Sequence, residues 1–139
     1  MSIRETLAWE LIQVNRAHRN LAAECLGQLG LHVGQEVLLS FLWEEDGLAQ
    51  SDLAERLGVE PPTVTKMLER MERTCLVERR RDPLDARVSR AYLTEKGKQV
   101  RQGAEACWSG LDARLIQSLS LEERLLLRRL LREMRGNLI

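Results

Sequence analysis

The sequence has few of the residues that mark disordered, fibrous or disulfide-stabilised proteins. Its 139 residues include only three prolines and nine glycines, whereas 44% are hydrophobic and 30% are charged. This composition excludes a collagen-like chain and a disordered one. Because the length is typical of one domain, we expect a single domain over residues 1–139.

Long apolar runs are missing as well. No stretch approaches the ~20 uncharged residues of a membrane span, and the first residues lack the apolar core of a signal peptide. The three cysteines, Cys25, Cys75 and Cys107, are odd in number and widely spaced, which favours reduced thiols over a disulfide framework. The sequence therefore predicts a cytoplasmic protein with no membrane contact.

Groups suited to catalysis or metal binding are scarce. The chain has only two histidines, His18 and His32, and neither has the close ligand spacing of a zinc site. The sequence contains no phosphate-binding glycine loop and no nucleophile elbow. We expect no enzymatic activity, no cofactor and no bound metal.

The charge is balanced overall but unevenly distributed. Residues 1–60 include 4 basic and 10 acidic residues, whereas residues 61–100 include 10 basic and 6 acidic ones. Residues 101–139 include 7 basic and 5 acidic residues, so the chain as a whole is neutral. A localised basic face favours nucleic-acid binding more than the overall pI does, and the central segment is the candidate.

Helices are expected at both ends of the chain. Apolar residues recur every three or four positions over residues 7–29 and again over 34–45, which predicts two helices. Thr94 can cap a long helix over residues 95–118, and Ser120 can cap a final one. This last helix is too rich in leucine to stand alone, so we expect it to pack against a partner.

The middle of the chain predicts two short helices and a hairpin. Residues 50–57 and 61–73 each have an apolar face, and Gly58 lies in the turn between them, as in a helix-turn-helix. Two strand-length runs, 76–81 and 88–93, then flank a turn-rich segment. Because a hairpin in this place is a wing, the expected fold class is mainly α with a small β-hairpin wing.

The central segment resembles the MarR family of bacterial transcription regulators. The most specific motif is Asp-x-Arg, here Asp85 and Arg87, followed after five residues by Leu93 and Thr94. Asp82 and the proline after it also match the family pattern. The flanking helices match in order and length, so the resemblance extends over nearly the whole chain.

The resemblance implies a homodimeric repressor. Residues 34–94 would form the winged helix-turn-helix, and residues 1–30 and 95–139 the dimerisation helices of one MarR-like domain. The homodimer would bind a palindromic operator in double-stranded DNA. A small-molecule effector, often an aromatic or phenolic acid, would release it, and in some family members cysteine oxidation does so instead.

The candidate DNA contacts lie on the helix-turn-helix and the wing. The N-terminus of the second helix would enter the major groove, where threonine and lysine can reach base edges. The start of the preceding helix and the wing arginines suit phosphates. The resemblance assigns Arg87 to a narrow minor groove and Asp85 to bracing the turn. The candidates are Gln50, Ser51, Pro62, Thr63, Thr65, Lys66, Arg70, Arg80, Asp85, Arg87 and Arg90.

An effector pocket is expected between the dimer helices and the winged part. The residues that could line it are polar or aromatic: Trp9, His18, His32, Trp43 and Trp108. The alternative is that the tryptophans fill the core and the dimer interface.

Three positions depart from the family pattern. His32 and Ala49 stand where the family has capping Thr or Ser, so the helices that follow are expected to be looser or capped otherwise. Cys75 replaces the glycine of a left-handed turn. Either the local geometry differs there, or Cys75 is a redox-active thiol near Arg73 and Arg79.

Other functions are compatible with the same fold. A thiol-based redox-sensing regulator is one alternative to a ligand-released repressor. A winged-helix protein-interaction module is another, although the arginines of the hairpin count against it. A DNA organiser with low sequence preference is the third.

Overall fold

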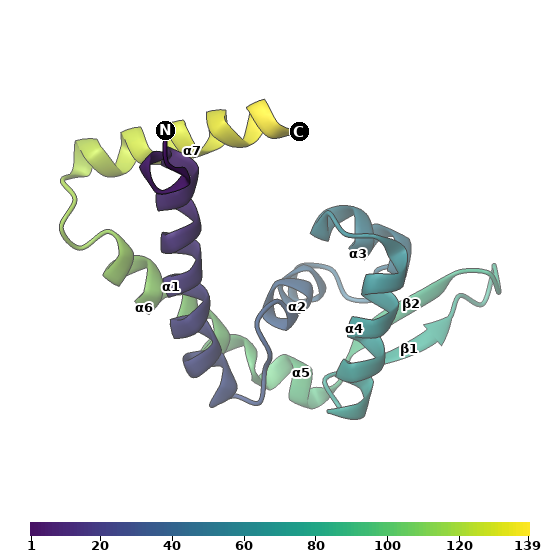
Figure 1. Ribbon diagram of the computed structural model, residues 1–139. Coiled ribbons are helices and arrows are strands. Elements are labelled where there is room, and N and C mark those ends of the chain that lie inside the picture. Colours follow the sequence, from purple (N-terminus) through teal and green to yellow (C-terminus); the bar gives the residue numbers. More distant parts are fainter.

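The computed structural model describes residues 1–139 as a helical chain with one β-hairpin (Figure 1). The elements are the 3-10 helix η1 (Ile3–Glu5), α1 (Leu7–Gly27), α2 (Gln35–Glu44), α3 (Gln50–Leu57), α4 (Pro61–Arg73), β1 (Val77–Arg81), β2 (Ser89–Leu93), α5 (Glu95–Gln99), α6 (Arg101–Leu115) and α7 (Leu121–Leu138). The expected fold class is confirmed. None of these helices is long and apolar enough to cross a membrane.

The elements form a winged end and a helical end, joined through α2. At the winged end α3 packs on α4, and α4 packs on β1. At the helical end α1 packs on α6, while α2 contacts both α6 and α3. The hairpin projects away from α1 and α7 (Figure 1).

The hydrophobic core lies where the two ends meet. Leu38 and Leu42 of α2, Leu53 of α3, and Leu68 and Met71 of α4 are all fully buried. Removing this much apolar surface from water fixes the position of α4 against the rest of the winged part. The outer face of α4 is therefore free for other contacts.

The wing is a short antiparallel hairpin. Its register pairs Val77 with Leu93 at the base and Arg81 with Ser89 near the tip. Ala49 forms an isolated bridge to Arg90, which ties the hairpin to the segment before α3. The hairpin is therefore anchored along one side as well as at its base.

The helix expected over residues 95–118 differs from the prediction: it is divided at Val100 into α5 and α6 and ends at Leu115.

The start of α2 is capped by the side chains of its own first two residues, in place of the residue before the helix. Gln35 Oε1 accepts from the His32 amide at 3.1 Å, and Glu36 Oε1 accepts from the Gly34 amide at 2.6 Å. Ala49 gives α3 no side-chain cap.

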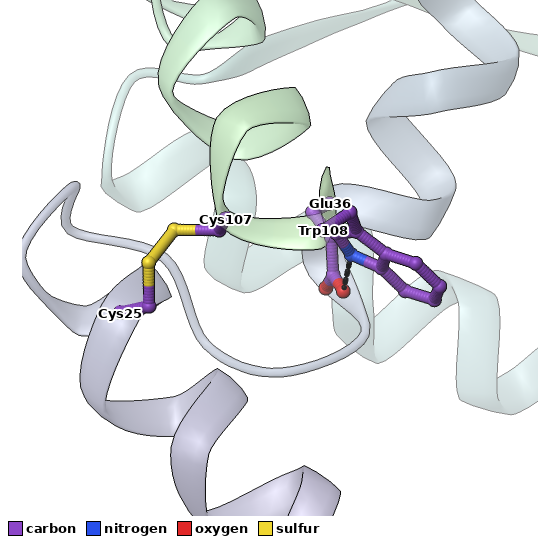
Figure 2. The surroundings of a disulfide bond; sticks show 4 residues. All are labelled: Cys25, Glu36, Cys107 and Trp108. Atoms are coloured by element: carbon purple, nitrogen blue, oxygen red, sulfur yellow. Dashed lines mark hydrogen bonds between the residues drawn. A yellow bond between two sulfur atoms is a disulfide. The ribbon is translucent and has the colours of Figure 1, made fainter. Parts of the chain in front are cut away.

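Cys25 and Cys107 form a disulfide bond, so the prediction of reduced thiols was wrong for this pair (Figure 2). The two residues are 82 positions apart in the sequence, but their Cα atoms lie 6.0 Å apart. They meet because α1 packs on α6, a contact that spacing in the sequence does not reveal. Cys75 is the free cysteine.

The terminal helices expose a large apolar surface. No residue of α7 is buried, and its leucines are 36% to 82% exposed. Leu7, Leu11 and Val14 of α1 are exposed as well. An amphipathic helix is normally stabilised by burial of its apolar face, and within this chain that burial is missing.

Candidate nucleic-acid interface

The outward face of α4 presents polar side chains to solvent. Pro61 starts the helix, and Val64, Leu68 and Met71 are buried on its inner face. The exposed residues of the outward face are Pro62, Thr63, Lys66, Glu69, Arg70 and Arg73. The four of them that were predicted as DNA contacts, Pro62, Thr63, Lys66 and Arg70, thus share one exposed face.

Thr65 and Gln50 meet at the flank of this face. Gln50 Nε2 donates to Thr65 Oγ1 at 3.3 Å, and Thr65 Oγ1 donates to the Pro61 carbonyl at 3.2 Å. Ser51 is exposed in the first turn of α3. The N-terminal parts of α3 and α4 therefore lie together. Free amides are available only in the first turn of α3, because Pro61 and Pro62 have no N–H and the Thr63 amide donates to the Glu60 carbonyl.

Arg87 lies at the tip of the wing. Its side chain is 91% exposed, and its guanidinium forms a two-point contact with Asp85: Nε to Oδ1 at 3.1 Å and Nη2 to Oδ2 at 3.2 Å. Asp85 Oδ1 also accepts from the Arg87 amide at 3.1 Å. These hydrogen bonds lower the pKa of the Asp85 carboxyl. The guanidinium keeps free donors that point into solvent.

Asp82 and Arg90 brace the wing at the end that leads into its turn. Arg90 donates from Nε to Asp82 Oδ2 at 2.7 Å and from Nη1 to the Gly47 carbonyl at 3.0 Å. Asp82 Oδ1 accepts from the Leu84 amide at 2.7 Å. Arg90 was expected beside a phosphate, but its guanidinium is already engaged within the protein. Sequence reasoning missed this pair, although Asp82 belongs to the matching motif.

The remaining wing arginines also have intramolecular partners. Arg79 Nε contacts Glu72 Oε1 at 2.7 Å, so Glu72 of α4 pairs across to β1. Arg80 Nε contacts Glu78 Oε1 at 2.7 Å, and its guanidinium lies 4.5 Å from the centre of the Tyr92 ring. These contacts restrain the Arg79 and Arg80 side chains.

A groove of about 530 Å³ separates α4 from the wing. Its lining includes Arg79, Arg80, Arg81 and Arg87 against one acidic residue, Glu72. A concave surface with an excess of arginine concentrates positive potential. This groove lies between the two elements that the sequence nominated for DNA contact.

A second cavity lies between α2 and α6. Trp43 and Trp108 line this space of about 270 Å³, so two of the five predicted pocket residues are brought together. His18 packs edge-on against Trp108 with ring centres 5.8 Å apart but does not line the cavity. Trp9 and His32 do not line it either. The acidic lining residues, Glu36 among them, had no recognisable sequence signal.

Cys75 adopts the left-handed conformation with φ of 62°. The expectation that the local geometry differs from a glycine turn was therefore wrong. Cys75 is exposed, and its carbonyl accepts from the Thr94 hydroxyl. That bond joins the end of α4 to the start of α5, which explains why the turn keeps this geometry without glycine.

Comparisons with known proteins agree with this arrangement. Residues 31–89 match the MarR family. The HTH-type transcriptional regulator YdgJ of Bacillus subtilis is 27% identical over 128 residues, which cover 92% of this chain and 78% of the relative. The HTH-type transcriptional repressor Rv2887 of Mycobacterium tuberculosis is 27% identical over 92% of both chains.

Among solved structures, that of the S. aureus MepR–DNA complex superimposes with a TM-score of 0.89. It is 26% identical in sequence, and the match covers 95% of this chain and 98% of that one. The chain therefore belongs to the MarR family of winged helix-turn-helix, DNA-binding transcriptional regulators.

Proposed function

We propose that this regulator acts as a homodimeric repressor that binds a palindromic operator and is released by a small molecule. The observation that carries the proposal is the arginine-lined groove between the flank of α4, at Thr65 and Glu72, and the wing. Its two walls match the two grooves of duplex DNA: a helix for the major groove and a thin, basic hairpin for the minor groove.

Within this proposal the two walls have different roles. Thr63 and Lys66 at the N-terminal part of α4 contact base edges in the major groove. Arg87 at the exposed wing tip enters the minor groove, where a narrow A·T-rich segment attracts arginine. Gln50 and Ser51 contact phosphate at the start of α3. Arg90 and Asp82 do not touch DNA but fix the direction of the wing.

Homodimerisation is supported by the apolar surface of the terminal helices. Leu126 and Leu130 of α7 and Leu11 of α1 are 39% to 49% exposed. A second copy of the chain would bury this surface, and a two-fold dimer presents two α4 helices to two equal half-sites. The palindromic operator follows from this symmetry.

Repression with release by an effector is supported by two observations. The relative Rv2887, similar over 92% of the chain, is named a transcriptional repressor. The cavity between α2 and α6 lies where the helical end meets the winged end. A ligand bound there contacts α6 and α2, and because α2 packs on α3 it can bias the spacing of the two wings.

Selection from random-centre duplex DNA at moderate salt tests the proposal, with the retained duplexes read by sequencing. The proposal predicts an enriched palindrome with half-sites about one helical turn apart. Retention without enrichment would instead indicate a DNA organiser, and no retention would indicate a protein-interaction module.

A further inference from the structure

The cavity between α2 and α6 has aromatic walls and room for a small ring compound. Its volume is about 270 Å³, and the apolar part of its lining comprises Val37, Trp43, Ala104 and Trp108. Small-molecule sites are typically concave and mostly apolar with a few placed polar groups. The chemistry of those polar groups decides which ligand fits.

The polar lining is acidic. Glu36, Glu44 and Glu105 line the cavity, and Arg101 is the one basic residue among them. Arg101 Nε lies 2.7 Å from Glu105 Oε1, so these two charges offset each other. Glu36 and Glu44 form no salt bridge, and their negative charges remain uncompensated.

Glu36 is the more telling of the two because it is only 4% exposed. Oε1 accepts from the Gly34 amide at 2.6 Å. Oε2 accepts from Trp108 Nε1 at 2.9 Å (Figure 2). Both donors are neutral, so the carboxylate is buried without a counter-ion, and burial of an unpaired charge is costly. Each oxygen has a further lone pair, and Trp108 places its ring beside the same group.

Tryptophan rings attract cations through their negatively charged faces. The Arg101 guanidinium already lies 5.9 Å from the centre of the Trp43 ring, which shows that this wall accepts a positive charge. Trp108 has no cation over its ring. Uncompensated carboxylates next to aromatic faces are the combination that recognises quaternary and protonated amines.

We propose that this cavity binds an organic cation, an amine or quaternary ammonium group attached to an apolar ring. The inference rests on the proposed role of the cavity as the effector site and specifies its ligand class. It departs from the aromatic acid that the family resemblance implied, because a carboxylate ligand would face Glu36 and Glu44. Repulsion between the ligand carboxylate and these two carboxylates of the same charge opposes binding.

Three probes of equal heavy-atom number separate charge from shape: benzyltrimethylammonium, 3-phenylpropanamide and 3-phenylpropionate. Their binding to the purified full chain is followed by tryptophan fluorescence and by calorimetry, without DNA. We expect the cation to bind saturably and about tenfold or more tighter than the amide, and the carboxylate to bind weakest.

Variants assign the effect to the cavity. Glu44→Gln and Glu36→Gln should each weaken binding of the cation about fivefold or more while amide binding changes little. Glu44 is exposed, so its variant keeps the test valid if Glu36→Gln fails to fold. Glu55→Gln, an exposed site on α3, removes the same charge elsewhere and should leave all three affinities unchanged.

The proposal is overturned if the carboxylate binds as tightly as the cation, if cation and amide bind equally, or if none of the three binds saturably. It is also overturned if Glu55→Gln weakens the cation as much as Glu44→Gln does. Because no DNA is present, these outcomes are independent of operator selection. A chain that selects a palindrome but binds no cation would retain its proposed function and lose only this ligand class.

Discussion

Arg90 on β2 donates from Nε to Oδ2 of Asp82, 2.7 Å away, where β1 leads into the turn of the wing. The same guanidinium reaches the carbonyl of Gly47 at 3.0 Å, so one side chain joins the wing turn to the segment that follows α2. The wing therefore moves with the winged part, and its tip is presented at a fixed angle to α4.

This contact predicts an unusual titration of Asp82. The hydrogen bond from the Arg90 side chain is the main reason that the pKa of Asp82 lies below its ordinary value. Since the folded pKa is depressed, the contact stabilises the protein above the ordinary aspartate pKa and is lost as the pH falls through the depressed value, below about pH 4.

Carboxyl NMR during a pH titration measures this directly. Arg90→Gln should return the pKa of Asp82 toward the ordinary value, whereas Arg114→Gln on α6 should not. A wild-type Asp82 that titrates at the ordinary value would show that the ion pair does not form in solution.

Arg87→Ala should weaken operator binding about tenfold or more, because each protomer of the proposed dimer would lose the arginine proposed for the minor groove. The variant should fold and dimerise normally, since the Arg87 side chain is 91% exposed. Fluorescence anisotropy with a selected duplex provides the affinity. Arg114→Ala removes one positive charge from α6 and serves as the matched control. If both variants lose the same affinity for DNA, Arg87 contributes only its charge and not a specific minor-groove contact.

Leu126→Asp should convert the proposed dimer to monomers. Leu126 is 49% exposed on α7 within one chain, and a carboxylate at a buried dimer interface would be left unpaired. Sedimentation equilibrium gives the mass of the assembly. Val59→Asp, at a residue 37% exposed between α3 and α4, is the control and should remain dimeric. A persisting Leu126→Asp dimer would exclude this face of α7 from the interface.

Cys75→Gly should stabilise the chain by about 0.5–1 kcal/mol. Cys75 has φ of 62°, a conformation that is costly for a residue with a Cβ and easy for glycine. The greater chain entropy of unfolded glycine offsets part of the gain. Urea unfolding midpoints measure the difference. Cys75→Ser keeps the Cβ and should show no gain; equal stability of Cys75→Gly and wild type would argue against a strained turn.

Loss of the disulfide should destabilise the chain by about 2–4 kcal/mol, since Cys25 and Cys107 close a loop with a sequence separation of 82. Cys107→Ser and dithiothreitol-treated wild type should unfold at the same lower urea concentration. Dithiothreitol should not affect Cys107→Ser. If reduction leaves the wild-type midpoint unchanged, the bond does not form in the purified protein.

Sequence periodicity located the helix-turn-helix and the hairpin because those elements depend on local patterns. Gly58 and Pro61 mark the boundary between α3 and α4 in the sequence and in the structure alike. Contacts between distant segments were not predictable in this way. The Cys25–Cys107 bond depends on how α1 packs on α6, and the brace at Arg90 depends on the hairpin register.

The acidic cavity shows the same limit. Trp43 and Trp108 could be nominated from their residue type alone, but Glu36 reads as an ordinary residue in the first turn of a helix. Its burial and its bond to Trp108, 72 positions away, arise only when α6 packs against α2. Ligand chemistry thus depends on tertiary contacts that periodicity does not encode.

Hydroxyl-radical footprinting of the full chain on a selected duplex tests the central claim most directly. Two α4 helices and two wings on one dimer predict protection with two-fold symmetry, including outer minor-groove segments on both sides of the centre. Arg87→Ala should lose those outer segments and keep the central protection. A single, asymmetric protected segment, or outer protection unchanged in Arg87→Ala, would contradict the account.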